Sequence, residues 1–433
     1  MKQFIKHITG IIGAVILAGS LSSCERYDYP DRFRATEGLP TVSYVRYADK
    51  DVFIDQAFMD EILCIVGTNL RSVHDIYFND QKAIINTSYI TDNTLVVSVP
   101  NTQATEVTNK LYLYNKDGDC VDYAFKVLPP VPKVLSMSNE WAKEGETVTL
   151  TGKYFMDVQS VAMPGAEVTD FTVDDSEHIS FKVPAGATAG PVSVTTASGS
   201  ANSSFQYLDQ RNMLFDFDGL RGGFATGNGW RAPATGHLHN PGDDAFDAVD
   251  GSYLWLGGQD GGLKADCFGV WGEDPYSFDY WNSTDPASSV PPLNTLPTFS
   301  SYIQKYGVGG LALKFECFVP TSNPWKTCSM MLMFTNSAVV SNENMTNAYF
   351  SDESVPRGLW TPWQATGSYD TGDKWVTVSI PLSEFTMTHA GTTCATKFDS
   401  SCLEGFALFV WGGYSGADCD PVIAVDHIRV VPM

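Results

Sequence analysis

Tryptophan is concentrated in the second half of this 433-residue sequence, where nine of the ten Trp residues follow residue 209. Two long connections between hydrophobic strand patterns, residues 271–307 and 336–372, hold several of them. Loops of that length in a compact domain are usually functional. A partly exposed indole can stack on the C–H face of a sugar ring, while planar polar groups bond the hydroxyl edge. We therefore expect the binding chemistry of this chain in its second half.

Seven side chains are our candidates for contact with a saccharide. Six are tryptophans that supply stacking faces, and one is an arginine that donates to the sugar edge: Trp325, Trp360, Trp363, Trp411, Trp281, Trp271 and Arg357. Each has a structural alternative: Trp363 as a buried anchor, and Arg357 as a solvated surface charge. Trp255 and Trp375 lie inside strand patterns and are predicted to belong to the core.

Three aspartates are candidate ligands for a structural calcium ion. Asp216, Asp218 and Asp426 would meet if the first and last strands of the second half pair, and carboxylate oxygens suit calcium. The alternative is an ordinary acidic surface cluster. No other cofactor is expected, because the Cys and His residues lack the spacing of a zinc site.

Catalytic motifs are scarce. A glycoside hydrolase needs two carboxylates at a fixed separation, and the many Asp and Glu residues leave that alternative open. The Gly-x-Ser-x-Gly and His-Glu-x-x-His patterns are absent from the sequence. We therefore predict that the protein is not an enzyme.

The N-terminus predicts export. Lys2 and Lys6 precede an apolar run over residues 8–21, which has the length of a signal-peptide core. The run ends in Leu21-Ser22-Ser23-Cys24, which resembles a bacterial lipobox. This predicts a signal peptide over 1–23, lipidation of Cys24 and a polar tether over 24–38. The acidic residues of that tether resemble the surface-export signal of Gram-negative lipoproteins, which implies an outer-membrane location facing the cell exterior. An ordinary secretory signal is the alternative.

The charge excludes one class of partner. The sequence has 27 Lys and Arg against 50 Asp and Glu, a formal net charge of -23, so it repels nucleic acid and acidic polysaccharides.

Eight of the nine Cys residues remain after Cys24. They form disulfides, with the region 394–419 favoured, or are buried thiols.

The first half contains a repeat. Leu63-Cys64-Ile65-Val66-Gly67 is echoed by Val148-Thr149-Leu150-Thr151-Gly152, and the strand ending at Pro100 is echoed by the strand ending at Pro184. The two spacings, 85 and 84 residues, indicate one duplicated module. Short strands rich in Val, Ile, Thr and Phe predict two small β-sandwiches, module 1 (residues 39–129) and module 2 (residues 130–208). We expect both to act as spacers, with Trp141 packed at a domain junction.

Residues 209–433 predict a third, larger sandwich, the C-terminal domain. Strand patterns recur there without a convincing long helix, at 214–218, 253–256, 311–318, 330–334, 375–380, 406–411 and 422–430. In 311–318, apolar residues alternate with Lys314 and Glu316, which predicts a sheet buried on one face. This number of strands predicts an all-β jelly roll.

Two families are suggested by motifs. The Gly-x-x-Phe/Leu turn and the Val-Pro strand end of each module resemble the IPT/TIG branch of immunoglobulin-like folds. Phe215-Asp216-Phe217-Asp218-Gly219, the closing strand at 426–432, and the string from Pro362-Trp363 to Leu382 resemble carbohydrate-binding jelly rolls. With the lipobox and the domain order, the whole chain is similar to the surface glycan-binding protein B family of polysaccharide-utilisation systems. It has two apparent spacer modules where the xyloglucan-binding type has three.

The resemblance implies non-catalytic binding of a neutral polysaccharide, a β-glucan or a hemicellulose such as xyloglucan, to aid its capture and uptake. It also implies an outer-membrane transporter with its lipoprotein lid as partner. The alternatives are a protein-binding adhesin or surface structural protein and, second, a glycoside hydrolase.

Overall fold

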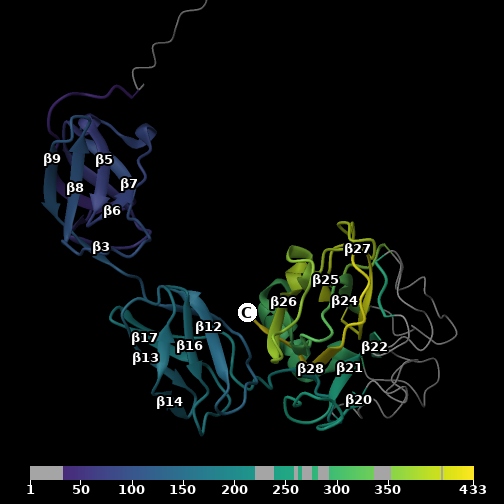
Figure 1. The fold of residues 1–433 in the computed structure, drawn as a ribbon. Helices are drawn as coiled ribbons and strands as arrows, with labels where there is room; N and C mark the ends of the chain where they lie inside the picture. Colours follow the sequence, from purple (N-terminus) through teal and green to yellow (C-terminus); the bar gives the residue numbers. More distant parts are fainter. Residues whose placement is uncertain are drawn as a thin grey trace, which may run out of the picture. The chain divides into compact units, whose positions relative to one another are not determined.

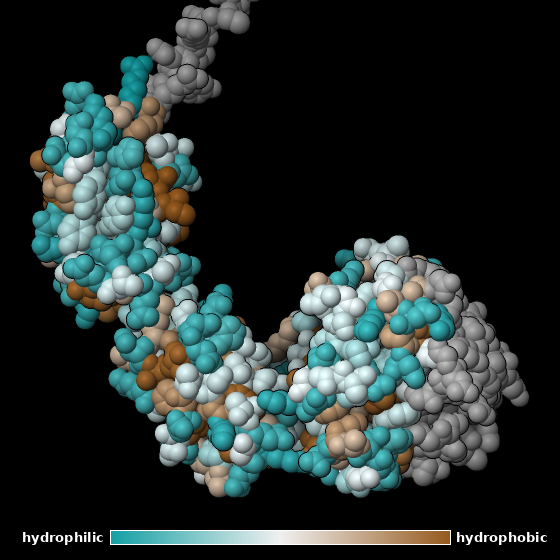
Figure 2. Space-filling view, in the orientation of Figure 1, coloured by the Kyte–Doolittle hydropathy of each residue, from teal (hydrophilic) through white to brown (hydrophobic). Residues whose placement is uncertain are grey.

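A computed structural model describes residues 33–219, 238–257, 262–265, 276–280, 292–335, 353–400 and 403–433 (Figure 1). Two compact units divide the chain, one ending at Pro130 and the other beginning at Val131. The predicted signal peptide and Cys24 lie outside the described residues. Among the helices of the described segments, none has the length and apolarity to cross a membrane. On the visible face of each unit, hydrophilic residues alternate with smaller hydrophobic patches (Figure 2).

The first unit contains module 1, a sandwich of two four-stranded sheets. Val45, Leu63, Ile65, Ile76 and Phe78 belong to the buried core between them. One sheet has the order β2-β1-β4-β7 and the other β6-β5-β8-β9, while β10 and β3 form a parallel pair. The bounds are β1 (Thr41–Tyr47), β2 (Phe53–Ile54), β3 (Gln56–Phe58), β4 (Ile62–Thr68), β5 (Val73–Phe78), β6 (Gln81–Ala83), β7 (Thr94–Ser98), β8 (Lys110–Asn115), β9 (Cys120–Ala124) and β10 (Lys126–Leu128), with 3-10 turns at η1 (Leu70–Ser72) and η2 (Thr87–Tyr89).

The second unit begins with module 2, which repeats the strand order of module 1 except for one edge strand of the first sheet. Its sheets have the orders β11-β12-β16-β15 and β14-β13-β17-β18. The bounds are β11 (Lys133–Met137), β12 (Thr147–Lys153), β13 (Val158–Met163), β14 (Ala166–Val168), β15 (Phe171–Val173), β16 (His178–Lys182), β17 (Ser193–Thr196) and β18 (Gly199–Asn202). Strands β11-β12-β16 correspond to β1-β4-β7, and the second sheet has the same order in both modules, as a duplication would give. The edge strand differs, because β2 pairs with β1 whereas β15 pairs with β16.

The repeated glycines have one physical cause in both modules. The register shifts at Val42/Tyr44 between β1 and β4 of module 1, and at Val134/Ser136 between β11 and β12 of module 2. At these bulges a backbone carbonyl turns toward the neighbouring strand. A Cβ on Gly67 would lie 1.8 Å from the Thr41 carbonyl oxygen, and one on Gly152 would lie 2.1 Å from that of Lys133. Only glycine fits this approach.

The C-terminal domain is a sandwich of a six-stranded and a four-stranded sheet, so the predicted all-β fold is confirmed. The larger sheet has the order β20-β21-β28-β23-β26 with β19 also paired to β28, and the smaller has the order β22-β27-β24-β25. The bounds are β19 (Met213–Phe215), β20 (Leu238–His239), β21 (Tyr253–Leu256), β22 (Ser277–Tyr280), β23 (Leu311–Phe318), β24 (Thr327–Thr335), β25 (Gly358–Trp360), β26 (Val376–Pro381), β27 (Gly405–Gly416) and β28 (Ile423–Pro432). The predicted pairing of the first and last strands is present, because Phe215 of β19 pairs with Ile428 of β28.

The predicted connection 271–307 differs from expectation. Its last part forms helix α2 (Pro297–Tyr306), which begins with a proline at its first position and ends before Gly307. Short 3-10 turns lie at η7 (Leu293–Thr295), η8 (Val308–Gly310), η10 (Pro362–Ala365) and η11 (Leu382–Glu384). The sequence of this segment does not predict a helix, because it lacks a long amphipathic pattern. Only Phe299 of α2 is buried.

Strand β23 corrects a second expectation. All eight of its residues are buried, including Lys314 and Glu316, which the alternation assigned to a solvated face. Module 2 covers that face, as the contacts of Glu140 described below show. The alternation was detected correctly, but both faces of the sheet are covered.

Cysteines contribute buried thiols. Cys64, Cys317 and Cys394 are buried free thiols, Cys419 is half-buried and Cys120 is exposed. Cys267 and Cys402 lie outside the described residues, and the region favoured for a disulfide includes one of them.

Candidate functional site

The four-stranded sheet of the C-terminal domain has two apolar faces. One packs on the six-stranded sheet through residues such as Met330, Leu332 and Leu408. The other carries a separate buried cluster of Met331, Met333, Ala407 and Phe409, against which Val355 and Leu359 pack. Register explains the separation, since Met331 pairs with Phe409 on one side and Leu359 on the other, and paired residues share a face.

Trp325 is not at the surface. Its side chain is fully buried, and its indole N–H donates to the carbonyl of Thr327. The backbone N–H and C=O of Trp325 both bond Tyr369, which draws the ring between the two sheets. A ring without exposed surface cannot stack on a sugar, so the predicted contact role of Trp325 is wrong in this structure.

Trp363 is the buried anchor that the alternative described. Its indole is 4% exposed and donates a hydrogen bond of 2.7 Å to the Cys328 carbonyl. Gly416 provides the space for this ring, because a Cβ at that position would lie 3.0 Å from the Trp363 ring. The predicted sugar contact of Trp363 is therefore replaced by a role in packing.

Arg357 is also fully buried, which contradicts both the edge-donor role and the alternative of a solvated charge. Its Nε donates to the Val355 carbonyl at 3.3 Å, and its Nη1 lies 3.8 Å from the Met331 sulfur. Arg357 directly precedes β25. Its backbone N–H donates to the Met387 carbonyl, and its carbonyl accepts from the Met387 N–H. Its guanidinium therefore belongs to the packing beside the Met331 cluster.

Trp360 retains part of its surface. Its ring makes edge-to-face contacts with Phe315, Trp325 and Tyr369, with centroid distances of 5.7, 5.5 and 5.5 Å. It is half-buried at the end of β25. Of the predicted contact tryptophans whose side chains are described, it is the one that is not buried.

The other three predicted tryptophans are outside what can be described in detail. Trp271 and Trp281 lie outside the described residues. Trp411 is described by its backbone, which pairs with Ser329 on β24, two residues before the pairing of Met331 with Phe409. Trp255 is half-buried and Trp375 is 9% exposed.

The predicted calcium ligands are not gathered at one point. Asp216 accepts from the backbone of Asp218, Asp218 accepts from the backbone of Ser252, and Asp426 is buried beside His427. Among the described residues, the group with ligand atoms within 4.8 Å of one another is Asp250, Asp426 and His427. A histidine in the set does not favour calcium, which takes oxygen ligands. Calcium binding stays a prediction.

A buried ion network joins module 2 to the C-terminal domain. Arg429 of β28 donates to Glu140 at 2.7 Å and to Glu316 at 2.7 Å, and Lys314 donates to Glu140 at 2.5 Å. None of the four side chains is more than 8% exposed. Such charges are stable in the interior only when each has its partner. This network was not predicted, because Glu140 lies in another module and is far from its partners in the chain.

Hydrogen bonds and an aromatic stack complete this joint. The N–H of Thr377 donates to the Ser138 carbonyl at 2.9 Å, and its hydroxyl accepts from the N–H of Glu140 at 2.7 Å. Trp141 lies flat on His427 with ring centroids 3.6 Å apart. The expectation that Trp141 packs at a domain junction is therefore correct.

Carboxylates determine the charge of the histidine in the joint. Burial lowers the pKa of His427, but the carboxylates of Asp250, Glu316 and Asp426 outweigh it and raise the pKa to about 10. Burial raises the pKa of Asp426 well above its usual range. Burial also acts to raise the pKa of Glu316, but Arg429 and His427 lower it overall. At neutral pH the His427 side chain is therefore a cationic imidazolium among the acidic side chains of Asp250, Glu316 and Asp426.

Comparison with known proteins agrees with this architecture. Residues 207–432 match the family model described as surface glycan-binding protein B xyloglucan binding domain, and residues 130–208 match that of the IPT/TIG domain. The fold and the two matches define a multidomain all-β glycan-binding protein. The chain belongs to the surface glycan-binding protein B family.

Individual relatives cover the chain to different extents. The crystal structure of surface glycan-binding protein PbSGBP-B from Prevotella bryantii is 34% identical, covers 92% of this chain and 99% of its own, and has a TM-score of 0.68. SGBP-B from a complex xyloglucan utilization locus in Bacteroides uniformis is 18% identical, covers 92% and 100%, and has a TM-score of 0.44. An IPT/TIG domain-containing protein of Bacteroides ovatus is 26% identical over 175 residues, 37% of this chain and 34% of that relative. The chain thus spans about a third of the length of this curated relative.

Proposed function

We propose that this protein binds a neutral, extended polysaccharide, a β-glucan or a hemicellulose such as xyloglucan, and holds it for uptake without cleaving it. The observation that carries the proposal is the family match over residues 207–432, together with 34% identity to a surface glycan-binding protein over 92% of the chain. The net charge of -23 supports a neutral ligand, because acidic polymers are repelled.

Aromatic side chains supply the contacts in this proposal. Trp360 keeps exposed surface at the end of β25. Trp411 lies on β27 two residues after Phe409, and its backbone pairs with Ser329 of β24. Trp271 and Trp281 stay in the proposal from the sequence. Trp325, Trp363 and Arg357 leave it, because their side chains are buried.

The location and partners form a second part of the proposal. The lipobox ending at Cys24 supports a lipid anchor on the outer membrane with the protein facing outward. Family membership supports an outer-membrane transporter and its lipoprotein lid as partners. Replacing Cys24 with Ser should release the protein from the membrane fraction, and retention there would contradict the anchor.

Affinity electrophoresis tests the binding function. Residues 25–433 are run through gels that contain xyloglucan, mixed-linkage β-glucan or other neutral polysaccharides, beside Trp360→Ala and Trp411→Ala. Tyr89→Ala is the matched control, because Tyr89 is an exposed aromatic residue of module 1. We expect one or more neutral glycans to retard the unmodified chain and the control, and weaker retardation of at least one Trp variant.

Two results would contradict the proposal. Free migration through every gel would remove the glycan function and favour the adhesin alternative. New reducing ends in polysaccharide incubated with the protein would show cleavage and favour a glycoside hydrolase.

A further inference from the structure

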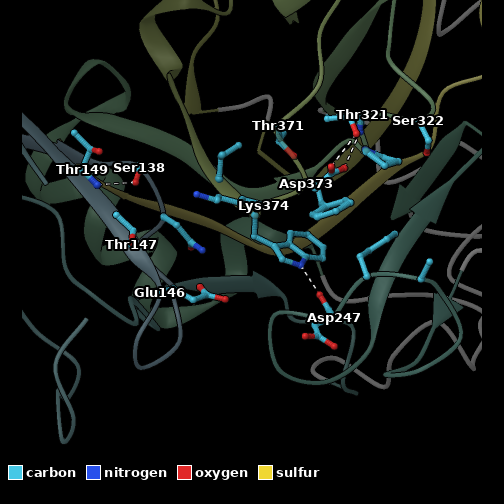
Figure 3. A pocket seen from close by; sticks show the side chains of 17 residues that line it. Ser138, Glu146, Thr147, Thr149, Asp247, Thr321, Ser322, Thr371, Asp373 and Lys374 are labelled. Atoms are coloured by element: carbon cyan, nitrogen blue, oxygen red, sulfur yellow. Dashed lines mark hydrogen bonds between the residues drawn. The ribbon is translucent and has the colours of Figure 1, made fainter. Parts of the chain in front are cut away.

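A cavity of the second unit lies beside the six-stranded sheet. It is a cavity of about 990 Å³ between module 2 and the six-stranded sheet of the C-terminal domain. In Figure 3, Ser138, Thr147 and Thr149 border one side, while Thr321 and Asp373 lie on the opposite side. Its volume is in the range of small-molecule sites, about 300–1,000 Å³.

The C-terminal side of the cavity presents an aromatic wall. Phe246 stacks on Phe318 with centroids 4.0 Å apart, and both lie within 6.1 Å of the Trp375 ring centroid. Trp375 is held by a hydrogen bond of 2.8 Å from its indole N–H to the Asp247 carbonyl. Phe246 remains half-buried, so it offers apolar surface to the cavity.

Polar groups around this wall are mostly hydroxyls and carboxylates. Glu146, Asp247 and Asp373 contribute three acidic side chains, against the single cation of Lys374. The Asp373 carboxylate is already engaged, because it accepts from the N–H and hydroxyl of Thr321 at 2.8 Å each. The carboxylate of Asp247 is exposed at the lower edge in Figure 3.

This combination matches one class of ligand. Acidic and hydroxyl groups accept hydrogen bonds from the many O–H donors of a sugar, and apolar surface suits the C–H face of the ring. An anionic ligand would meet three carboxylates and is disfavoured. A neutral oligosaccharide meets both requirements.

The joint between the two domains holds the walls together. Thr377 follows directly after the Trp375–Val376 edge of the cavity and bonds Ser138 and Glu140 on the module 2 side. Both walls are therefore fixed by the buried network of Arg429, Glu140 and Glu316, so little ordering is needed when a ligand enters. Module 2 would thus contribute to binding in addition to acting as a spacer.

We infer that this cavity is a second saccharide subsite, which takes a short neutral stretch or side branch of the glycan. The inference rests on the proposed function and deepens it by adding contacts from module 2. Two subsites on one unit raise the affinity for a long chain above that for a short oligosaccharide, because the second contact is intramolecular.

The test blocks the cavity from the module 2 side. Thr147→Arg fills it with a long side chain, and Asp247→Ala removes an exposed acceptor without adding bulk. Thr172→Arg is the matched control, an exposed Thr on β15 of the same module outside the cavity. Binding of residues 25–433 to xyloglucan polysaccharide is measured by isothermal titration calorimetry, and thermal unfolding verifies that each variant is folded.

We expect Thr147→Arg and Asp247→Ala each to weaken polysaccharide binding about three- to tenfold. This is the effect expected when one or two hydrogen bonds or an apolar contact with the sugar are lost. Thr172→Arg should bind like the unmodified chain. Equal affinity of all three variants and the unmodified chain overturns the subsite while leaving the proposed function intact. Absence of binding by the unmodified chain to every neutral glycan tested overturns both.

Discussion

The indole of Trp141 and the imidazole of His427 lie face to face, with centroids 3.6 Å apart and an angle of 13° between the planes. One ring comes from module 2 and the other from the last strand of the C-terminal domain. His427 also contacts Asp250 at 3.2 Å, so the stack links an aromatic ring to a charged group held by carboxylates. An imidazolium on an indole face gains from cation–π attraction as well as from packing.

Removing the indole should weaken the second unit. Trp141→Ala leaves a cavity beside His427 and should lower the free energy of unfolding by about 3 kcal/mol, as expected for a buried large aromatic residue. Trp141→Phe should lose less, because it keeps a stacking ring. Chemical denaturation followed by fluorescence measures both. Equal stability of the alanine variant and the unmodified chain would mean that the stack contributes nothing.

The pKa of His427 predicts how stability depends on pH. In the folded chain this pKa is raised to about 10 from the ordinary 6.5. The protonated form is therefore favoured by folding, and its stabilisation is fully present below pH 6.5 and is lost as the pH rises through about 10. The contribution amounts to up to about 5 kcal/mol. Asp250, Glu316 and Asp426 are the facing acidic groups.

Thermal unfolding between pH 6 and 10 tests this dependence. The unmodified chain should lose stability steadily over the interval, whereas His427→Gln should be less stable at pH 6 and show a flatter profile. Parallel profiles for the two proteins would show that His427 does not carry the effect.

The buried network should be far more sensitive than an exposed ion pair. Glu140→Gln removes the shared carboxylate of Lys314 and Arg429 and should destabilise the chain by about 3–5 kcal/mol, because it leaves buried cations without their partner. Lys110→Met is the comparison, since the 2.7 Å pair of Lys110 with Asp122 is about half exposed on both sides. That change should cost about 1 kcal/mol or less. Similar losses in the two variants would argue against burial as the cause.

The two repeat glycines should not tolerate alanine. Gly67→Ala and Gly152→Ala would each place a methyl group against a backbone carbonyl, and we expect losses of about 3 kcal/mol from forced shifts of the strands. Gly309→Ala is the control, because no atom lies within 4 Å of its added Cβ. Circular dichroism melts compare the three. Native-like melting of Gly152→Ala would show that the bulge adapts readily.

Local patterns in the sequence were sufficient to predict the strands. The alternation in 311–318, the glycine repeat and the runs of Val, Ile and Phe depend on residues close in the chain, and the structure confirms an all-β fold of sandwiches. The pairing of β19 with β28 was expected from the resemblance of the first and last strand motifs to carbohydrate-binding jelly rolls, but its register was not predicted.

Contacts between distant residues were beyond the same reasoning. A Trp next to Pro324 reads as a loop residue, and only the bonds of Trp325 to Tyr369 reveal that the segment turns inward. Lys314 reads as solvated because its partner Glu140 lies in another module, and Glu316 reads so because its partner Arg429 is more than a hundred residues away in the chain. Burial of Arg357 likewise depends on the packing of β24 and β25 and not on its neighbours in sequence.

The Arg429 network limits how this protein can be rearranged by recombination. A fragment that starts at residue 209 would leave Lys314 and Arg429 without their partner Glu140. A last domain transplanted onto an unrelated spacer would need a replacement carboxylate at the same point. The smallest exchangeable piece that keeps these charges matched is therefore residues 131–433, and variation in spacer number among related proteins is expected before Val131 and not after it.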